Sequence, residues 1–167
     1  FHAAAAAGME ALMTAHVLFP ALEPELPATL SRRLLTGVLR EEWNYAGVVA
    51  SDDLGMRAVA ERWPIEELVV EGLLAGVDAF LIREDRSRQE AALAALASAA
   101  ERRADVRARV DESAARVARF KALAAVPLPL DGEALRARLG TPASLALAAR
   151  LAGSGPGREA ESEVARV

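Results

Sequence analysis

The spacing of short apolar segments constrains the fold of this chain more than any other feature. Such segments begin at Ala11, Gly47 and Val77, so their starts are 36 and 30 residues apart. Each interval contains one stretch with apolar residues at helical spacing. This βα repeat is typical of proteins built on a parallel sheet. The intervals fit a (β/α)8 barrel, which uses roughly 31 residues per unit, and a doubly wound sheet has the same spacing.

The three apolar segments are expected to be parallel strands buried on both faces, because they are nearly continuous apolar runs. We expect them at residues 11–18, 47–52 and 77–82. The first run continues to Phe19 and is ended by Pro20. Caps and helical spacing predict helices over the following segments: Phe1–Gly8, Ser31–Trp43, Pro64–Gly76, Arg86–Arg103, Asp105–Leu123 and Pro142 to about Leu151. An extended break is expected at Val126–Leu130.

Charge and composition exclude several functional classes. The chain has 20 Lys and Arg against 24 Asp and Glu, a net charge of −4, so electrostatics gives no reason to expect a nucleic-acid partner. Its longest uncharged run, Ala11–Leu22, has 12 residues and is too short to span a membrane. The absence of cysteine excludes disulfides, a thiolate zinc site and a cysteine nucleophile.

The strongest candidate site is the segment Ser51–Met56, which places two carboxylates at the carboxyl end of a buried strand. Sites are built at that end of the strands in barrels and in open α/β sheets. Side chains alternate along a strand, so Asp52 and Asp53 are expected to point to opposite faces and to have different roles. A solvated loop or a helix cap is the alternative interpretation. A metal site is disfavoured, because adjacent strand residues diverge and no third ligand lies nearby.

Several ordered motifs also carry a resemblance to a known family. They are Met13–Val17 (MTAHV), Phe19–Leu22 (FPAL), Pro27–Ser31 (PATLS), Gly37–Glu42 (GVLREE), Gly47–Met56 (GVVASDDLGM) and Ala75–Ile82 (AGVDAFLI). Together they resemble glycoside hydrolase family 3, in particular its bacterial β-N-acetylhexosaminidase branch. The resemblance implies an α/β fold: the last three βα units of a TIM-type (β/α)8 barrel followed by C-terminal helices, with the barrel incomplete in this chain.

The resemblance implies a retaining exo-β-N-acetylglucosaminidase that releases terminal GlcNAc from peptidoglycan fragments or chitooligosaccharides. Asp52 matches the nucleophile that forms a covalent glycosyl-enzyme, and Asp53 is expected to fix the loop. Met56 and His16 are expected to contact the sugar; an ordinary core methionine and a loop-supporting histidine are the alternatives. No metal or organic cofactor is implied.

The general acid/base is absent from this chain according to the same resemblance. In this branch an Asp-His pair supplies it, in a loop after a Lys-His-Phe-Pro-Gly-His-Gly sequence, and neither occurs here. This chain alone is therefore expected to be inactive. A β-glucosidase or β-xylosidase of the same family and a non-catalytic fragment are the alternative functions; the first usually has Ser-Asp-Trp where this chain has Ser51–Asp53.

The domain organisation follows from the same considerations. Residues 1–104 are expected to be the C-terminal part of the barrel, residues 105–152 a helical extension, and residues 153–167 a flexible tail or linker. Three strands cannot close a barrel, so about five units, on the order of 150 residues, would precede Phe1. No signal peptide is visible, which favours the cytoplasm, although a preceding segment could carry one.

Charged segments outside the candidate site are interpreted as solvated surface. Arg83–Arg86 follows the third expected strand and is interpreted as a turn, with substrate contact as the less favoured alternative. The arginines of Arg102–Arg103 and Arg107–Arg109 are interrupted by acidic residues, which predicts an exposed helix face.

Overall fold

A computed structural model describes residues 1–83, 85–123, 132 and 140–153 of the chain. The chain divides into two compact units, residues 1–125 and 126–167. The expected break at Val126–Leu130 and the tail beyond Gly153 lie outside the described residues. The domain boundaries at 104 and 152 therefore stay a prediction. No described helix is long and apolar enough to cross a membrane.

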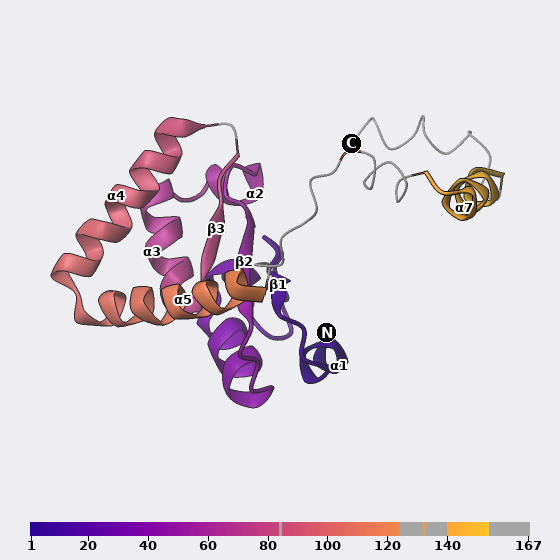
Figure 1. Ribbon diagram of the computed structural model, residues 1–167. Coiled ribbons are helices and arrows are strands. Elements are labelled where there is room, and N and C mark those ends of the chain that lie inside the picture. The colour runs from indigo at the N-terminus through magenta and orange to yellow at the C-terminus, as the bar shows by residue number, and fades with distance from the viewer. Residues whose placement is uncertain (84, 124–131, 133–139, 154–167) are drawn as a thin grey trace. The chain divides into compact units, whose positions relative to one another are not determined.

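The first unit is built on a three-stranded parallel sheet (Figure 1). Its strands are β1 (Ala11–Met13), β2 (Val48–Asp53) and β3 (Ala79–Leu81), adjacent in that order. Ala11 pairs with Val48, and Ala50 pairs with Ala79. The parallel arrangement that the βα spacing predicts is confirmed, and the order β1, β2, β3 is the one that consecutive barrel strands have.

The first strand is much shorter than the apolar run predicted. After Met13 the last backbone N–H that donates to β2 is that of Thr14, which binds Ala50 O at 2.8 Å. The next backbone groups bond to another segment: Ala28 N donates to Val17 O, and the Thr29 hydroxyl to Ala15 O. These bonds draw residues 15–17 away from the sheet. The expected burial was also wrong, since Val17, Leu18 and Phe19 are exposed.

Helices occupy the segments between and after the strands. The helices of the first unit are α1 (His2–Ala6), the 3-10 turn η1 (Ala28–Leu30), the π-type helix η2 (Arg33–Glu42), α2 (Arg57–Ala60), α3 (Ile65–Ala75), α4 (Arg86–Arg102) and α5 (Ala104–Leu123). In the second unit α7 covers Pro142–Gly153. The Thr141 hydroxyl accepts a hydrogen bond from Ser144 N there, as the predicted cap requires.

Local sequence explains where the principal helices begin and end. The Ser31 hydroxyl accepts a hydrogen bond from Leu34 N at 3.1 Å and caps η2. Asp85 caps α4 through Arg88 N at 3.1 Å. The α5 helix begins at Ala104 and not at an Asp105 cap; Asp105 lies in its first turn, where its carboxylate pairs with Arg103. Gly76 ends α3 with φ +134°, a conformation that favours glycine.

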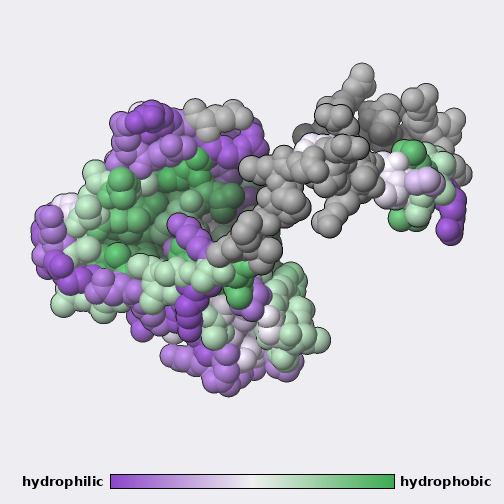
Figure 2. Space-filling view, in the orientation of Figure 1, coloured by the Kyte–Doolittle hydropathy of each residue, from purple (hydrophilic) through white to green (hydrophobic). Residues whose placement is uncertain are grey.

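The described helices cover one face of the sheet. Val49 of β2 is fully buried among η2 residues and Val77, and Phe80 of β3 packs against residues of α3. By alternation, Met13 of β1 lies on the opposite face, where its side chain is 58% exposed. Leu81 of β3 is 41% exposed. This face of the sheet is therefore open at Met13 and Leu81, although Val48 on the same face is buried. Figure 2 shows further apolar surface in a hollow bordered by α4 and α5.

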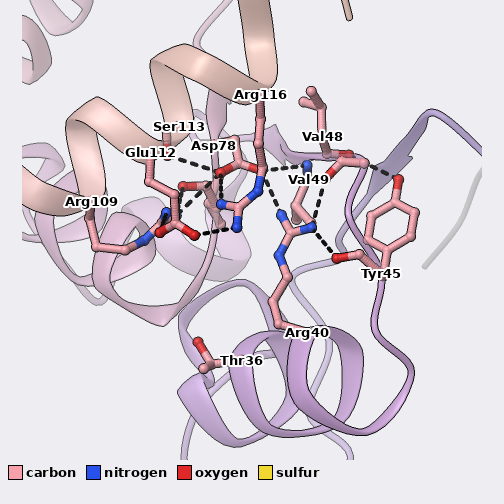
Figure 3. A network of polar contacts seen from close by, with 12 residues as sticks. Thr36, Arg40, Tyr45, Val48, Val49, Asp78, Arg109, Glu112, Ser113 and Arg116 are labelled. Carbon is pink, nitrogen blue, oxygen red and sulfur yellow. Dashed lines mark hydrogen bonds and ion pairs between the residues drawn. The ribbon is translucent and has the colours of Figure 1, made fainter. Parts of the chain in front are cut away.

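A buried carboxylate joins the amino ends of β2 and β3 to two helices (Figure 3). Asp78 directly precedes β3, and its side chain is fully buried. Its Oδ2 accepts hydrogen bonds from Arg40 and from the N–H of Val49, at 2.6 and 3.0 Å. Its Oδ1 accepts three bonds from α5 side chains, at 2.9 to 3.2 Å: Arg109, Ser113 and Arg116. The prediction of a fully solvated arginine face was therefore wrong at Arg109.

Candidate active site

Asp52 and Asp53 are the last two residues of β2, at its carboxyl end. The pairing between β2 and β3 is irregular beside them. Ala50 of β2 pairs with Ala79 of β3, and the next pair is Asp53 with Leu81. This is one extra residue on β2, a β-bulge, which re-aims neighbouring side chains. Strict alternation therefore does not extend through the end of β2, and no local sequence pattern signals the bulge.

The two carboxylates make different contacts, although both residues are half-buried. Asp52 Oδ1 accepts a hydrogen bond from the backbone N–H of Asp53 at 2.7 Å. Asp53 Oδ1 accepts from the N–H groups of Gly55 and Arg83, at 2.9 and 3.3 Å. The Gly55 bond outweighs the effect of burial and, together with Arg83, holds the pKa of Asp53 below its usual value. Asp53 is thus an ionised anchor for the loop.

His16 lies in the loop after β1 and reaches the end of β2. Its Nδ1 is 2.9 Å from Thr29 Oγ1, and its Nε2 is 3.1 Å from the carbonyl oxygen of Asp53. Thr29 is fully buried, and its hydroxyl lies 3.3 Å from that of Thr14. The carboxyl ends of β1 and β2 thus bring His16 to the Asp52–Asp53 loop, as the parallel arrangement predicts.

Met56 lies at the start of α2, and its side chain is 44% exposed. Its N–H donates to Asp53 O at 3.0 Å, so the same carbonyl accepts bonds from His16 and from Met56. The backbone of Met56 therefore belongs to the loop, while its side chain is accessible at the surface.

Two residues that the sequence analysis did not single out also hold this loop. Arg88 of α4 donates from Nη2 to Leu54 O at 3.1 Å, and Thr29 holds the ring of His16. Thr29 lies within one of the motifs that resemble the family, so the sequence offered a signal for it. The role of Arg88 depends on a tertiary contact that no sequence motif indicates. The turn at Arg83 also contributes, because its N–H binds Asp53.

The described residues contain no cluster of three or more His, Asp or Glu side chains that could hold a metal ion. What the arrangement supplies is a carboxylate with one oxygen anchored by a backbone N–H, at the end of a parallel strand. A carboxylate held in this way can serve as a nucleophile or stabilise a developing positive charge.

Comparison with known proteins is consistent with this chemistry. The profile described as "Glycosyl hydrolase family 3 N terminal domain" matches residues 1–120. A β-hexosaminidase of Pseudomonas aeruginosa is 42% identical over 88 residues, covering 53% of this chain and 26% of the relative. The β-hexosaminidase A of Pseudoalteromonas piscicida is 32% identical over 161 residues, covering 84% of this chain and 26% of the relative.

Solved structures agree with these sequence matches. A family 3 β-N-acetylglucosaminidase from Paenibacillus sp. str. FPU-7 superposes with a TM-score of 0.71 and 41% identity, over 79% of this chain and 26% of that one. The β-N-acetylglucosaminidase from Thermotoga maritima gives 0.62 and 34%, over 67% and 25%. The chain spans about a quarter of the length of these relatives. The family predicted from the motifs is confirmed: this chain belongs to glycosyl hydrolase family 3 and matches its N-terminal domain.

Proposed function

We propose that this chain forms the last three βα units of the catalytic barrel of a retaining exo-β-N-acetylglucosaminidase. The enzyme would release terminal GlcNAc from peptidoglycan fragments or chitooligosaccharides. The names of the relatives support the class of sugar, since they are β-hexosaminidases and β-N-acetylglucosaminidases. The parallel order of β1, β2 and β3 supports the barrel, because it is the order that consecutive barrel strands have.

Asp52 is the nucleophile in this proposal, and its position carries the argument. Its carboxylate lies at the carboxyl end of β2, with Oδ1 fixed by the N–H of Asp53. A carboxylate oxygen would attack the anomeric carbon, forming a glycosyl ester while the bond to the leaving oxygen breaks. The leaving oxygen takes a proton from a general acid. Water, deprotonated by the same group, then hydrolyses the ester with retention.

The general acid/base would come from the rest of the barrel, in a segment outside this chain. The open face of the sheet supports the proposal that the barrel continues outside this chain. Met13 is exposed on that face, and the further strands of a barrel would cover it. The 167-residue chain alone would therefore be inactive. We call the complete polypeptide that carries this segment the full-length enzyme. The catalytic variants below are made and assayed in that protein.

Replacement of Asp52 in the full-length enzyme tests the mechanism. Asp52→Asn keeps the size of the side chain but removes the anionic nucleophile, so kcat should fall by roughly 10³-fold or more while KM changes little. Asp53→Asn, the adjacent matched variant, should lose less, because that carboxylate binds backbone N–H groups of the loop. The measurement is hydrolysis of an aryl N-acetyl-β-glucosaminide.

Covalent trapping identifies the nucleophile directly. A 2-acetamido-2-deoxy-5-fluoro glycoside with an activated leaving group keeps the N-acetyl group of GlcNAc and should label the peptide that contains Asp52, as peptide mass spectrometry would detect. Label on a different carboxylate, or full activity of Asp52→Asn, would refute the assignment. The same assay on the 167-residue chain should give no turnover.

A further inference from the structure

We propose that His16 is a positioning residue that sets the orientation of the Asp52 carboxylate through the backbone of Asp53, with Thr29 holding the imidazole in place. The proposal rests on the function proposed above for Asp52. This role differs from direct contact of His16 with the sugar, because both ring nitrogens already have partners within the protein.

The hydrogen positions on the ring follow from its partners. Asp53 O is a carbonyl oxygen and can only accept, so Nε2 of His16 must carry a hydrogen. Thr29 has one hydroxyl hydrogen and lies within reach of His16 Nδ1, Ala15 O and Thr14 Oγ1. Nδ1 accepts from Thr29 when the hydroxyl hydrogen points to the ring, and donates to Thr29 when that hydrogen points to Ala15 O or Thr14 Oγ1. The bond from Nε2 to Asp53 exists in both states.

Asp53 transmits this restraint to Asp52. The backbone N–H of Asp53 donates to Asp52 Oδ1 at 2.7 Å, and its carbonyl accepts from His16 Nε2 at 3.1 Å. The N–H and the carbonyl flank a single Cα, so rotation of the Asp53 backbone would move the donor that anchors Asp52. The Asp53 side chain is also held, by Gly55 N and Arg83 N. His16 is the side chain from the neighbouring βα unit that completes this set.

His16 adds its hydrogen bond where the β2–β3 ladder is irregular. One extra residue lies on β2 between Ala50 and Asp53, so this stretch of the ladder with β3 is irregular. Leu54 N still donates to Leu81 O of β3 at 2.9 Å, and Met56 N donates to Asp53 O at 3.0 Å. His16 adds a bond to the same peptide group from the β1 side. Thr29 is fully buried and close to Thr14, so the support behind the imidazole is itself fixed. A displacement of a reacting group by about 1 Å can cost 10²-fold in rate.

Two pairs of variants in the full-length enzyme test the proposal. His16→Phe keeps a planar ring but has no donor, whereas His16→Gln carries an amide N–H that can replace Nε2. We expect kcat of His16→Phe to fall by about 10- to 100-fold, with KM within about threefold. His16→Gln should recover most of this loss. Thr29→Val should lower kcat in the same way, and Thr29→Ser, which keeps the hydroxyl, should lower it less.

Trapping kinetics separate this proposal from the assignment of Asp52. In His16→Phe the fluoro glycoside should still label Asp52, but about 10- to 100-fold more slowly. Label on another residue would instead overturn the proposed function. A raised KM with unchanged kcat in His16→Phe, or equal loss in His16→Gln and His16→Phe, would overturn the positioning role. If His16→Phe does not fold, the comparison of Thr29→Val with Thr29→Ser decides in the same way.

Discussion

Asp78 offers a sharp test of what holds the first unit together. Asp78→Asn replaces one carboxylate oxygen by an NH2 group, while the shape of the side chain stays nearly the same. Five donors converge on the carboxylate, and three of them are guanidinium groups. The substitution therefore places a donor against donors and removes the negative charge that balances Arg40, Arg109 and Arg116.

The expected loss of stability follows from burial and charge. Removing one partner of a buried ion pair costs about 3–5 kcal/mol, because the other charge is left uncompensated. Here the arginine side chains are 12 to 18% exposed, so water screens part of their repulsion. Glu112 also remains paired with Arg109 and Arg116. We therefore expect the lower part of that range, about 3–4 kcal/mol.

Urea unfolding of the full-length enzyme, followed by circular dichroism, measures the effect. With a denaturant slope of about 2–3 kcal/mol per molar, the midpoint should fall by roughly 1–2 M. Asp111→Asn, at an exposed position on α5, is the matched control and should shift the midpoint little. A midpoint for Asp78→Asn equal to that of the control would refute the conclusion that the network stabilises the unit.

Two further predictions concern the loop and the open surface. The pKa of Asp53 is lowered, so its carboxylate stabilises the fold fully above its ordinary pKa of 3.8 and loses that effect as the pH falls through the lowered pKa. The difference in melting temperature between wild type and Asp53→Asn should therefore be present at about pH 6 and shrink at about pH 3. A difference that does not change with pH would contradict this. The 167-residue chain alone should self-associate in sedimentation experiments and bind a hydrophobic dye, because Met13 and Leu81 are exposed. A monomer that binds no dye would show that the exposed apolar face does not cause self-association.

The sequence predicted the elements that depend on local pattern. The βα spacing indicated the three parallel strands, and Gly76 and Ser31 marked helix boundaries that the structure contains. The first strand was overestimated because apolarity alone does not distinguish a strand from a loop whose backbone is bonded elsewhere. Hydrogen bonds from Ala28 and Thr29 to residues 15–17 decide that case, and they join segments over ten residues apart.

The candidate site was predictable in part. The position of Asp52 at the carboxyl end of a strand, and the approach of His16 to that end, follow from parallel topology and need no knowledge of side-chain contacts. The partner of His16 did not follow from sequence, since a histidine beside a site can face either a sugar or the protein. The bulge at Asp53 and the contact of Arg88 with Leu54 depend on how the strand and α4 pack, which local sequence does not determine.

The amino and carboxyl ends of the strands are held in physically different ways, and this separates stability from chemistry. At the amino ends a buried charge gathers arginines from η2 and α5, so several elements move together if it is lost. At the carboxyl ends uncharged hydrogen-bond acceptors replace the buried charge: His16 and Met56 N donate to Asp53 O, Arg88 donates to Leu54 O, and Leu54 N donates to Leu81 O. Loss of one such bond should shift a carboxylate without unfolding the unit. Substitutions at His16 should therefore change kcat far more than the free energy of unfolding, and substitutions at Asp78 should do the reverse.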